Sequence, residues 1–381
     1  MIMMGVGIIA EYNPFHNGHM YHLQKIKEMF PDSVLVLVMS GNFTERGDVS
    51  IIDKWKKTKI AKEAGVDLIV ELPFAFATQS ADFFAYGAIS ILEKLKVSKV
   101  VFGSESDNID DLEVIAKTQL SNPDFDKLVK IYSKFGENYP TSLSLAINDL
   151  TGKKIDAPND LLGVSYIKTI LRNSYNIEAI PIKRTNDYHG INIDKISSAT
   201  AIREALKSGE NVNEAVPQFV MDNLSDLHFI DDYFSLLKYK IITDCNLARY
   251  QTVDEGIEGK LKKEIVNAKS YDDLINRVKS KRYTYNKIKR MLLHILIGFT
   301  KDEAKGMKEV EYIRILGFSS RGQSYLNSIK KDVDIEILSK FKRNMSSQLE
   351  LELRSSSIYA LAHNEEYLVS EEYKNHLRKE L

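Results

Sequence analysis

Short runs rich in valine and isoleucine alternate with helical patterns over the first half of the chain, and this alternation constrains the fold more than any other feature. Five such runs, each long enough only for a buried strand, lie at residues 6–10, 34–39, 68–72, 100–102 and 177–182. Between two of them, Asp53 can cap a helix with Ile60 and Ala64 in its apolar stripe, and Gly65 can end it. Strands joined by helices form a parallel sheet, so we predict an α/β, Rossmann-like fold with its ligands at the carboxyl ends of the strands.

The second part of the chain has a different pattern. Long helical periodicities occupy residues 230–243, 283–299 and 348–363, and no clear Val/Ile-rich run accompanies them. We therefore predict a sheet domain at residues 1–212, followed by a mostly α-helical C-terminal domain at residues 213–381. The boundary rests on the turn-forming composition of residues 207–217.

The composition is that of an ordinary globular protein. Of 381 residues, 44% are hydrophobic, and 52 basic side chains nearly balance 53 acidic ones, which excludes disordered and collagen-like chains. Cys245 is the only cysteine, which excludes an internal disulfide and favours a reducing compartment, so we expect a cytoplasmic protein. No stretch reaches the roughly 18 uncharged apolar residues that span a bilayer, and residues 1–10 are expected to form a strand instead of a secretion signal. We expect no membrane partner.

A helix is expected to begin directly after the first strand, at His16-Asn17-Gly18-His19. Gly18 lets a phosphate approach the backbone, the helix start offers free N–H groups, and the two imidazoles add donors, so this segment suits a nucleotide. An ordinary capped helix start would explain Asn17 and Gly18 but not the two histidines. His16, His19 and His22 also have the spacing of metal ligands, but no carboxylate or cysteine follows at ligand spacing, so we predict no metal site.

A second candidate anion site precedes a helix late in the first part of the chain. Residues 195–203 read KISSATAIR, in which Ser197, Ser198 or Thr200 can cap a helix and Arg203 can turn back toward its start. Exposed N–H groups, Lys195 and Arg203 would then hold a diphosphate leaving group. Alone, such a segment is more often an ordinary helix cap. Combined with the histidine segment, it favours a nucleotidyltransferase.

Together the two segments resemble the HIGH-type nucleotidyltransferase superfamily. A narrower resemblance, to the tRNA(Met) cytidine acetate ligase family, rests on blocks in order along the whole chain: EYNPFHNGH at 11–19, GNF at 41–43, RG at 46–47, DKW at 53–55, LP at 72–73, ATQ at 77–79, AD at 81–82 and KRYTY at 281–285. The resemblance implies an enzyme that activates acetate with ATP, giving acetyl-adenylate and pyrophosphate. It then acetylates the exocyclic amine of the wobble cytidine of elongator tRNA(Met).

The resemblance also implies which residues contact ATP. These are Ile9, Ala10, Glu11, Tyr12, Asn13, Pro14, Phe15, His16, Asn17, Gly18, His19, Met20, Tyr21 and His22, with Gly103, Asn159, Arg184, Thr185, Ser198 and Thr200. Attack of a carboxylate on the α-phosphate requires in-line positioning and neutralisation of the phosphates, so we assign the catalytic roles to His16, His19, Lys195 and Arg203. Mg²⁺ is expected to accompany the ATP. Phe15, Phe43 and Phe74 are apolar candidates for the acetate pocket.

A basic segment in the second part of the chain is the candidate RNA site. Residues 279–290 contain six basic side chains, two tyrosines and no acid. Basic groups bind phosphates and tyrosine rings stack on unpaired bases, so we predict RNA contacts at Lys281, Arg282, Tyr283, Tyr285, Lys287 and Arg290. The alternative is a solvated helix start. Arg314 and Arg321 mark a second, weaker candidate surface.

Two other functions stay open on these residues. One is an adenylyltransferase that acts on a small phosphorylated metabolite. The other is a non-catalytic RNA-binding protein with a nucleotide-binding fold. About 165 residues beyond the first domain favour a macromolecular substrate over a metabolite, and a non-catalytic scaffold has no need for His16, His19, Lys195 and Arg203 together.

Overall fold

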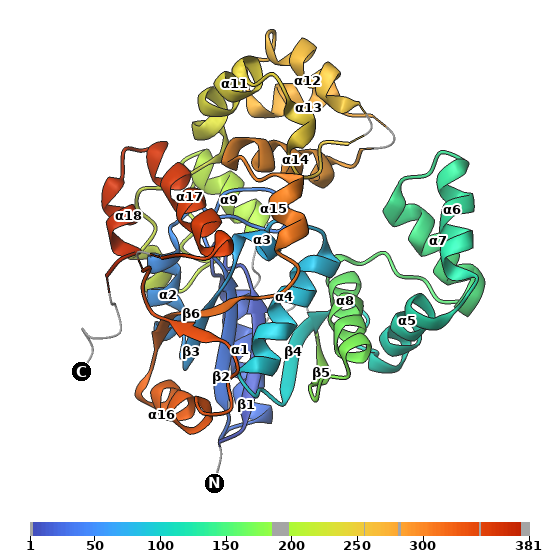
Figure 1. Ribbon diagram of the computed structural model, residues 1–381. Coiled ribbons are helices and arrows are strands. Elements are labelled where there is room, and N and C mark those ends of the chain that lie inside the picture. Colours follow the sequence, from blue (N-terminus) through green and yellow to red (C-terminus); the bar gives the residue numbers. More distant parts are fainter. Residues whose placement is uncertain (1–2, 185–197, 255, 281–282, 343, 375–381) are drawn as a thin grey trace.

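The chain folds around a single seven-stranded sheet, as the computed structural model in Figure 1 shows. The structure describes residues 3–184, 198–254, 256–280, 283–342 and 344–374. Its strand order is β5-β4-β1-β2-β3-β6-β7. The strands are β1 (Gly5–Ala10), β2 (Val34–Ser40), β3 (Leu68–Leu72), β4 (Lys99–Ser104), β5 (Glu178–Lys183), β6 (Tyr312–Phe318) and β7 (Glu336–Leu338).

The first five strands are all parallel to their neighbours, which confirms the predicted Rossmann-like sheet. Side chains of β2 alternate between the two faces of the sheet. Val34, Val36 and Val38 belong to the hydrophobic core on one face, whereas Leu35 and Leu37 belong to the core on the other. Because both faces are covered, the strand reads as an unbroken apolar run.

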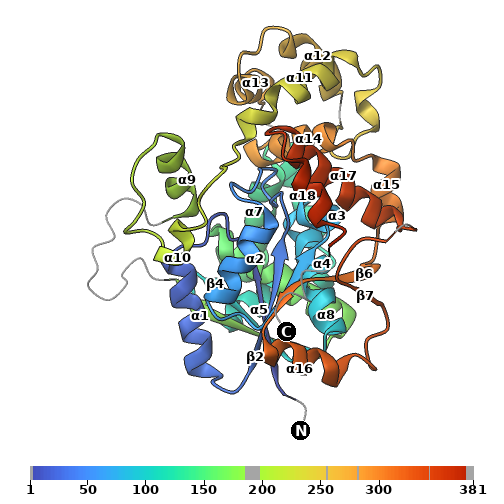
Figure 2. The ribbon, with the colours of Figure 1, turned by 90° about the vertical axis from the view of Figure 1, so that its left-hand side faces the viewer.

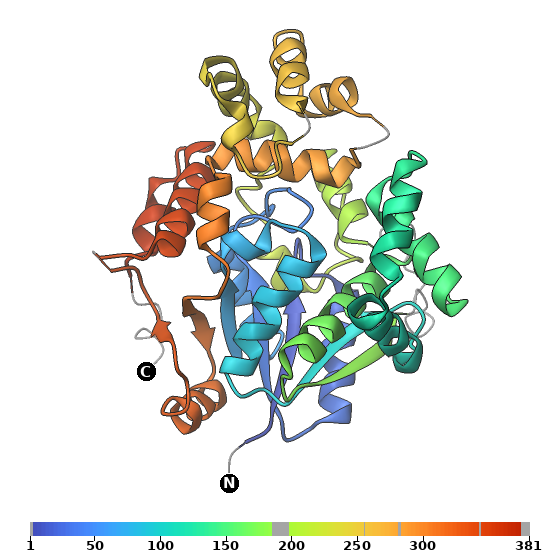
Figure 3. The same cartoon turned by 45° about the vertical axis from the view of Figure 1, so that its right-hand side comes forward.

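The helices up to α10, which itself lies beyond the predicted boundary at residue 212, cover the two faces (Figures 1 and 2). The face with the Leu35 core carries α1 (Asn17–Met29), α2 (Lys54–Glu63), α9 (Ala199–Lys207) and α10 (Gln218–Met221). The opposite face carries α4 (Ala81–Lys94), α5 (Ile109–Ser121) and α8 (Pro158–Asn173), with the short α3 (Phe74–Ala77) before α4. Helices α6 (Phe125–Lys134) and α7 (Tyr139–Thr151) form a lobe that projects beside α8 (Figure 3).

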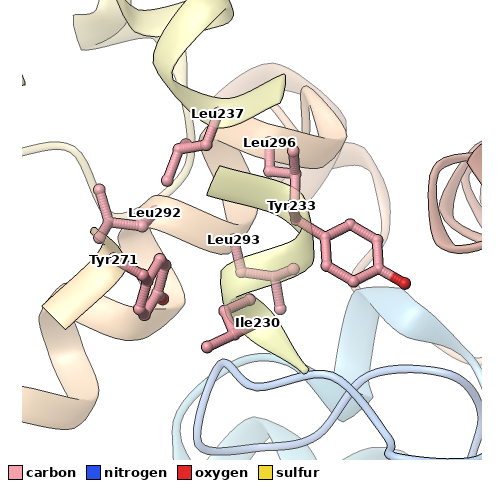
Figure 4. A pocket seen from close by; sticks show the side chains of 7 residues that line it. All are labelled: Ile230, Tyr233, Leu237, Tyr271, Leu292, Leu293 and Leu296. Carbon is pink, nitrogen blue, oxygen red and sulfur yellow. The ribbon is translucent and has the colours of Figure 1, made fainter. Parts of the chain in front are cut away.

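The second part of the chain is mostly helical, as predicted. Its helices are η1 (Ile230–Tyr233), α11 (Phe234–Thr243), η2 (Leu247–Arg249), α12 (Ile257–Ile265), α13 (Tyr271–Val278), α14 (Tyr285–Ile297), α15 (Lys301–Gly306), α16 (Ser320–Ile329), α17 (Ser347–Leu361) and α18 (Glu366–Glu371). Seven side chains of η1, α11, α13 and α14 converge without leaving room for a water molecule (Figure 4). This convergence is hydrophobic core, not a ligand site. None of the helices in the described ranges is long and apolar enough to cross a membrane.

Two strands of the C-terminal part join the sheet, which the sequence analysis did not anticipate. Strand β6 pairs antiparallel with β3, and β7 pairs parallel with β6. The β6 sequence is interrupted by Arg314 and Gly317, so it lacks the Val/Ile-rich run expected of a buried strand. The division at residue 212 stays a prediction, and such a division has to allow for the return of residues 312–338 to the sheet.

Candidate active site

The first helix begins at the carboxyl end of β1, and two histidines cap it. His16 is the N-cap, and its Nδ1 accepts a hydrogen bond from the Gly18 N–H at 3.0 Å. The His16 N–H in turn donates to Nδ1 of His19 at 3.2 Å, which completes a capping box. The two rings lie 3.8 Å apart, centroid to centroid. Because both Nδ1 atoms are acceptors, each neutral ring carries its proton on Nε2, which leaves one donor per histidine.

The histidines of this segment are neutral near pH 7. Burial, followed by the charge of Arg184, lowers the pKa of His16 to about 4 and that of His22 to about 4. The same burial lowers the pKa of His19 well below its usual value, and the neighbouring His16 adds to the shift. The site therefore offers imidazole N–H donors, while its positive charge comes from arginines.

The lowered pKa of His16 makes the stability of the fold depend on pH. An unfolded histidine takes up a proton near pH 6.5, but folded His16 does so only near pH 4. Protons therefore favour the unfolded chain, and we expect stability to be lost as the pH falls from about 6.5 to about 4. His16→Asn keeps a good N-cap without a titrating ring, so its loss of stability over this range should be smaller. Urea unfolding at several pH values measures this, and an unchanged pH dependence in the variant would contradict the assignment. His22 and His294, whose pKa values are also lowered to about 4, should leave a residual slope.

The second predicted segment reaches the first across the domain. Ser198 caps α9 by accepting the Ala201 N–H at 3.2 Å. From the same helix, the Arg203 Nη1 donates to the main-chain carbonyl of Asn13 at 2.7 Å, and its Nη2 donates to the Thr200 hydroxyl at 3.2 Å. Segments 190 residues apart in sequence thus meet at the carboxyl end of β1. Thr185 and Lys195 lie outside the described residues.

The ends of β4 and β5 bring together three other predicted nucleotide contacts. A Cβ on Gly103 would lie 3.1 Å from Cγ of Arg184, so the arginine side chain passes directly over the glycine. Asn159, at the start of α8, donates from its side-chain amide to the Glu105 carboxylate. Asp160 beside it accepts the N–H groups of Glu105 and Ser106, each at 3.0 Å. The charge of Arg184 also lowers the pKa of His16, so Arg184 is the member of this group that acts on the histidine segment.

Sequence reasoning missed Lys57, which joins the ends of β1 and β2. Its buried ammonium donates to the carbonyl oxygens of Glu11, Ser40 and Gly41 at 3.0, 2.7 and 2.7 Å. Burial lowers its pKa to about 7. A signal was present, because Lys57 shares the apolar helix stripe of Ile60 three residues later.

The three phenylalanines considered for the acetate pocket are all buried. Phe15 packs against Tyr12 and His19, with ring centroids 4.8 and 5.5 Å away. Phe43 and Phe74 pack edge to face at 5.6 Å in the main hydrophobic core. Only Phe15 therefore borders the histidine segment.

Several side chains of the basic segment at residues 279–290 contact other parts of the protein, which the sequence did not predict. Tyr283 is buried, its hydroxyl donates to the Asp254 carbonyl, and Lys287 lies 4.6 Å over its ring. The ring is thus enclosed within the protein, and its contact with an RNA base stays a prediction. Tyr285 is 41% exposed, although its hydroxyl donates to Asp272 at 2.8 Å. Lys281 and Arg282 lie outside the described residues.

Two arginines proposed for RNA contact are also engaged within the protein. Arg290 pairs with the Glu45 carboxylate at 2.7 Å instead of lying free for a phosphate. Arg314 is fully buried and pairs with Glu71 at 2.9 Å and with Glu372. The RNA contact of Arg290 stays a prediction, whereas buried Arg314 offers no surface to RNA and Arg321 is exposed.

The Arg290 ion pair links α14 to the active site. Its partner Glu45 donates its N–H to the Glu11 carboxylate at 2.6 Å, directly after β1. We expect Arg290→Gln to destabilise the protein by about 1–3 kcal/mol, because burial already raises the pKa of Glu45 and the variant removes its cation. A double-mutant cycle with Glu45→Gln in urea unfolding measures the coupling. The exposed Lys305–Asp302 pair is the control, expected near zero; equal couplings for the two pairs would refute the role of Arg290.

The described residues contain no group of three or more histidine, cysteine, aspartate or glutamate side chains that could hold a metal ion. Magnesium bound to a nucleotide takes most of its ligands from phosphates and water.

Two histidines begin a helix at the end of the first parallel strand, and an arginine from a later helix returns to this strand end. This arrangement defines a class of nucleotide-binding enzymes. The family model of the HIGH Nucleotidyl Transferase matches residues 3–374. The chain belongs to this family.

Individual relatives narrow the assignment. The tRNA(Met) cytidine acetate ligase of Caldicellulosiruptor saccharolyticus is 42% identical over 98% of both chains, and that of Geobacillus sp. is 40% identical over 89% of both. The crystal structure of Thermotoga maritima TmcAL bound with alpha-thio ATP superposes with a TM-score of 0.86 at 30% identity, covering 94% of this chain and 95% of that one. Within the nucleotidyl transferases, the chain is a member of the tRNA(Met) cytidine acetate ligase family.

Proposed function

We propose that the protein activates acetate with ATP and transfers the acetyl group to the exocyclic amine of the wobble cytidine of elongator tRNA(Met). The observation that carries this proposal is the hydrogen bond from Arg203 to the Asn13 carbonyl, which joins the two phosphate-binding segments at one strand end. The relatives' names supply the substrates.

Acetate attacks the α-phosphate of ATP, which yields acetyl-adenylate and pyrophosphate. The Nε2–H groups of His16 and His19 donate hydrogen bonds to the oxygens that gain charge in the transition state. Arg184 and Lys195 neutralise phosphates, and Arg203 holds the Asn13 loop in place. Mg²⁺ bound to the phosphates would draw charge onto the pyrophosphate.

In the second step the cytidine amine attacks the acetyl carbonyl, and AMP leaves. This step needs the anticodon loop at the carboxyl ends of the strands, with tRNA held by the helical part of the chain. The proposed contacts with tRNA are exposed Tyr285 and the basic residues Lys281, Arg282 and Lys287. Because tRNA is modified in the cytoplasm, we place the protein there. We assign acetate activation to a domain at residues 1–212 and tRNA binding to a domain at residues 213–381.

The test uses the purified protein with ATP, Mg²⁺, labelled acetate and total bacterial tRNA. Digestion of the tRNA to nucleosides should place the label in acetylcytidine. A transcript of elongator tRNA(Met) with uridine at the wobble position is the control and should stay unlabelled. Absence of labelled nucleoside, from protein with an intact thermal transition, would refute the proposal.

A further inference from the structure

A cavity of about 250 Å³ lies between α4 and α8, which run side by side on one face of the sheet (Figures 1 and 3). The cavity is lined by Asp82, Phe83 and Tyr86 of α4, by Lys168 and Arg172 of α8, and by Lys308 after α15. Lys168 and Arg172 follow Asn159 by 9 and 13 residues in the same helix. At 1.5 Å per residue, the cavity is thus about 14–20 Å along α8 from the proposed ATP site.

The lining carries more positive than negative charge. Asp82 pairs with Lys168 at 2.7 Å and accepts the Ser165 hydroxyl at 3.0 Å, so these two charges neutralise each other. Within the ranges that the structure describes, neither the side chain of Arg172 nor that of Lys308 has a hydrogen bond or an ion pair. Glu309 is the opposing charge nearby, since it helps raise the pKa of Tyr86. Two cations therefore remain available to an anion.

Aromatic rings lie beside these cations. Phe83 is 47% exposed, which is unusual for a ring on a core helix. Tyr86 is anchored behind it, with its ring centroid 6.2 Å from that of Phe76. An exposed ring next to arginine and lysine combines the two features that bind a nucleotide, because bases stack on aromatic rings and phosphates pair with cations.

We propose that this cavity binds one nucleotide outside the adenylation site, with its base on Phe83 and its phosphate between Arg172 and Lys308. The volume lies just below the roughly 300–1,000 Å³ of small-molecule sites, so the cavity holds no more than one nucleotide. That nucleotide is either free in solution or one residue of an RNA strand. The inference does not depend on acetyl transfer.

The test compares the full-length variant R172E/K308E with the control K330E/K331E, which makes the same charge change at two exposed lysines directly after α16. Equilibrium dialysis with labelled AMP counts the free nucleotide bound per chain. Binding of a tRNA transcript at several salt concentrations tests whether the cavity binds one nucleotide of an RNA strand. A thermal transition like that of the wild type establishes that both variants are folded.

One AMP fewer per chain in R172E/K308E than in the control would support a site for a free nucleotide. An RNA affinity at least tenfold lower, with a log-log salt slope flatter by about two, would support a nucleotide within RNA. Phe83→Ala should weaken the same ligand without changing the salt slope, and no effect of this change would refute base stacking. Equal behaviour of R172E/K308E and the control in both assays would overturn the site.

Discussion

Replacing His19 by alanine is expected to lower acetate-dependent ATP–pyrophosphate exchange by about 10²–10³-fold, because one donor to the transition-state charge is lost. The ring accepts the His16 N–H through Nδ1, so Nε2–H is its remaining donor. Its low pKa keeps it neutral at working pH, which means that the effect is loss of a hydrogen bond and not of a charge. Exchange of labelled pyrophosphate into ATP, measured beside thermal unfolding, reports on activity per folded molecule.

A second substitution at this position separates chemistry from capping. Alanine also removes the acceptor for the His16 N–H, which costs about 1 kcal/mol of stability. Glutamine at the third helical position can accept that N–H and restore the capping box. We expect His19→Gln to recover stability while exchange stays as low as in His19→Ala. Recovery of exchange in the glutamine variant would assign His19 to helix capping alone.

Features set by local sequence were predictable. The five parallel strands follow the Val/Ile-rich runs within a few residues, because strands buried on both faces need apolar side chains throughout. Asp53 caps α2 by accepting the N–H groups of Trp55 and Lys56, and Gly65 follows the helix with a φ of +89°. The histidine helix start was predictable for the same reason, since a cap contacts residues only two or three positions away.

Features set by distant partners were not predictable. Arg314 reads as a solvent-exposed cation, yet it is buried in β6 because carboxylates from β3 and from the end of α18 surround it. Tyr283 in its basic segment reads as an RNA-stacking ring, but the Asp254 carbonyl and the helical core enclose it. The environment of such residues depends on contacts between chain segments far apart in sequence, and no local pattern records these.

Replacing Lys281, Arg282 and Lys287 together by glutamine is expected to lower tRNA affinity and to flatten its log-log salt slope by about two to three units. Each lost phosphate contact removes roughly one released counterion. Lys287 is half-buried over the Tyr283 ring and forms no ion pair with the described residues, so its charge is not neutralised within the protein. Filter binding of a tRNA transcript over a range of salt measures the slope. The same three changes at exposed Lys330, Lys331 and Lys340 control for net charge.

Pyrophosphate exchange should survive in this triple variant, since Lys287 forms no bond to the strand ends within the described part of the chain. Arg290→Gln is the contrasting case. Its Glu45 partner contacts Glu11 at the end of β1, so loss of the pair should lower exchange as well. An unchanged tRNA affinity and slope in the triple variant would move the RNA site elsewhere, to Arg321 or the cavity between α4 and α8. Loss of exchange in the triple variant, with folding intact, would mean that the basic segment acts on the nucleotide and not on tRNA alone.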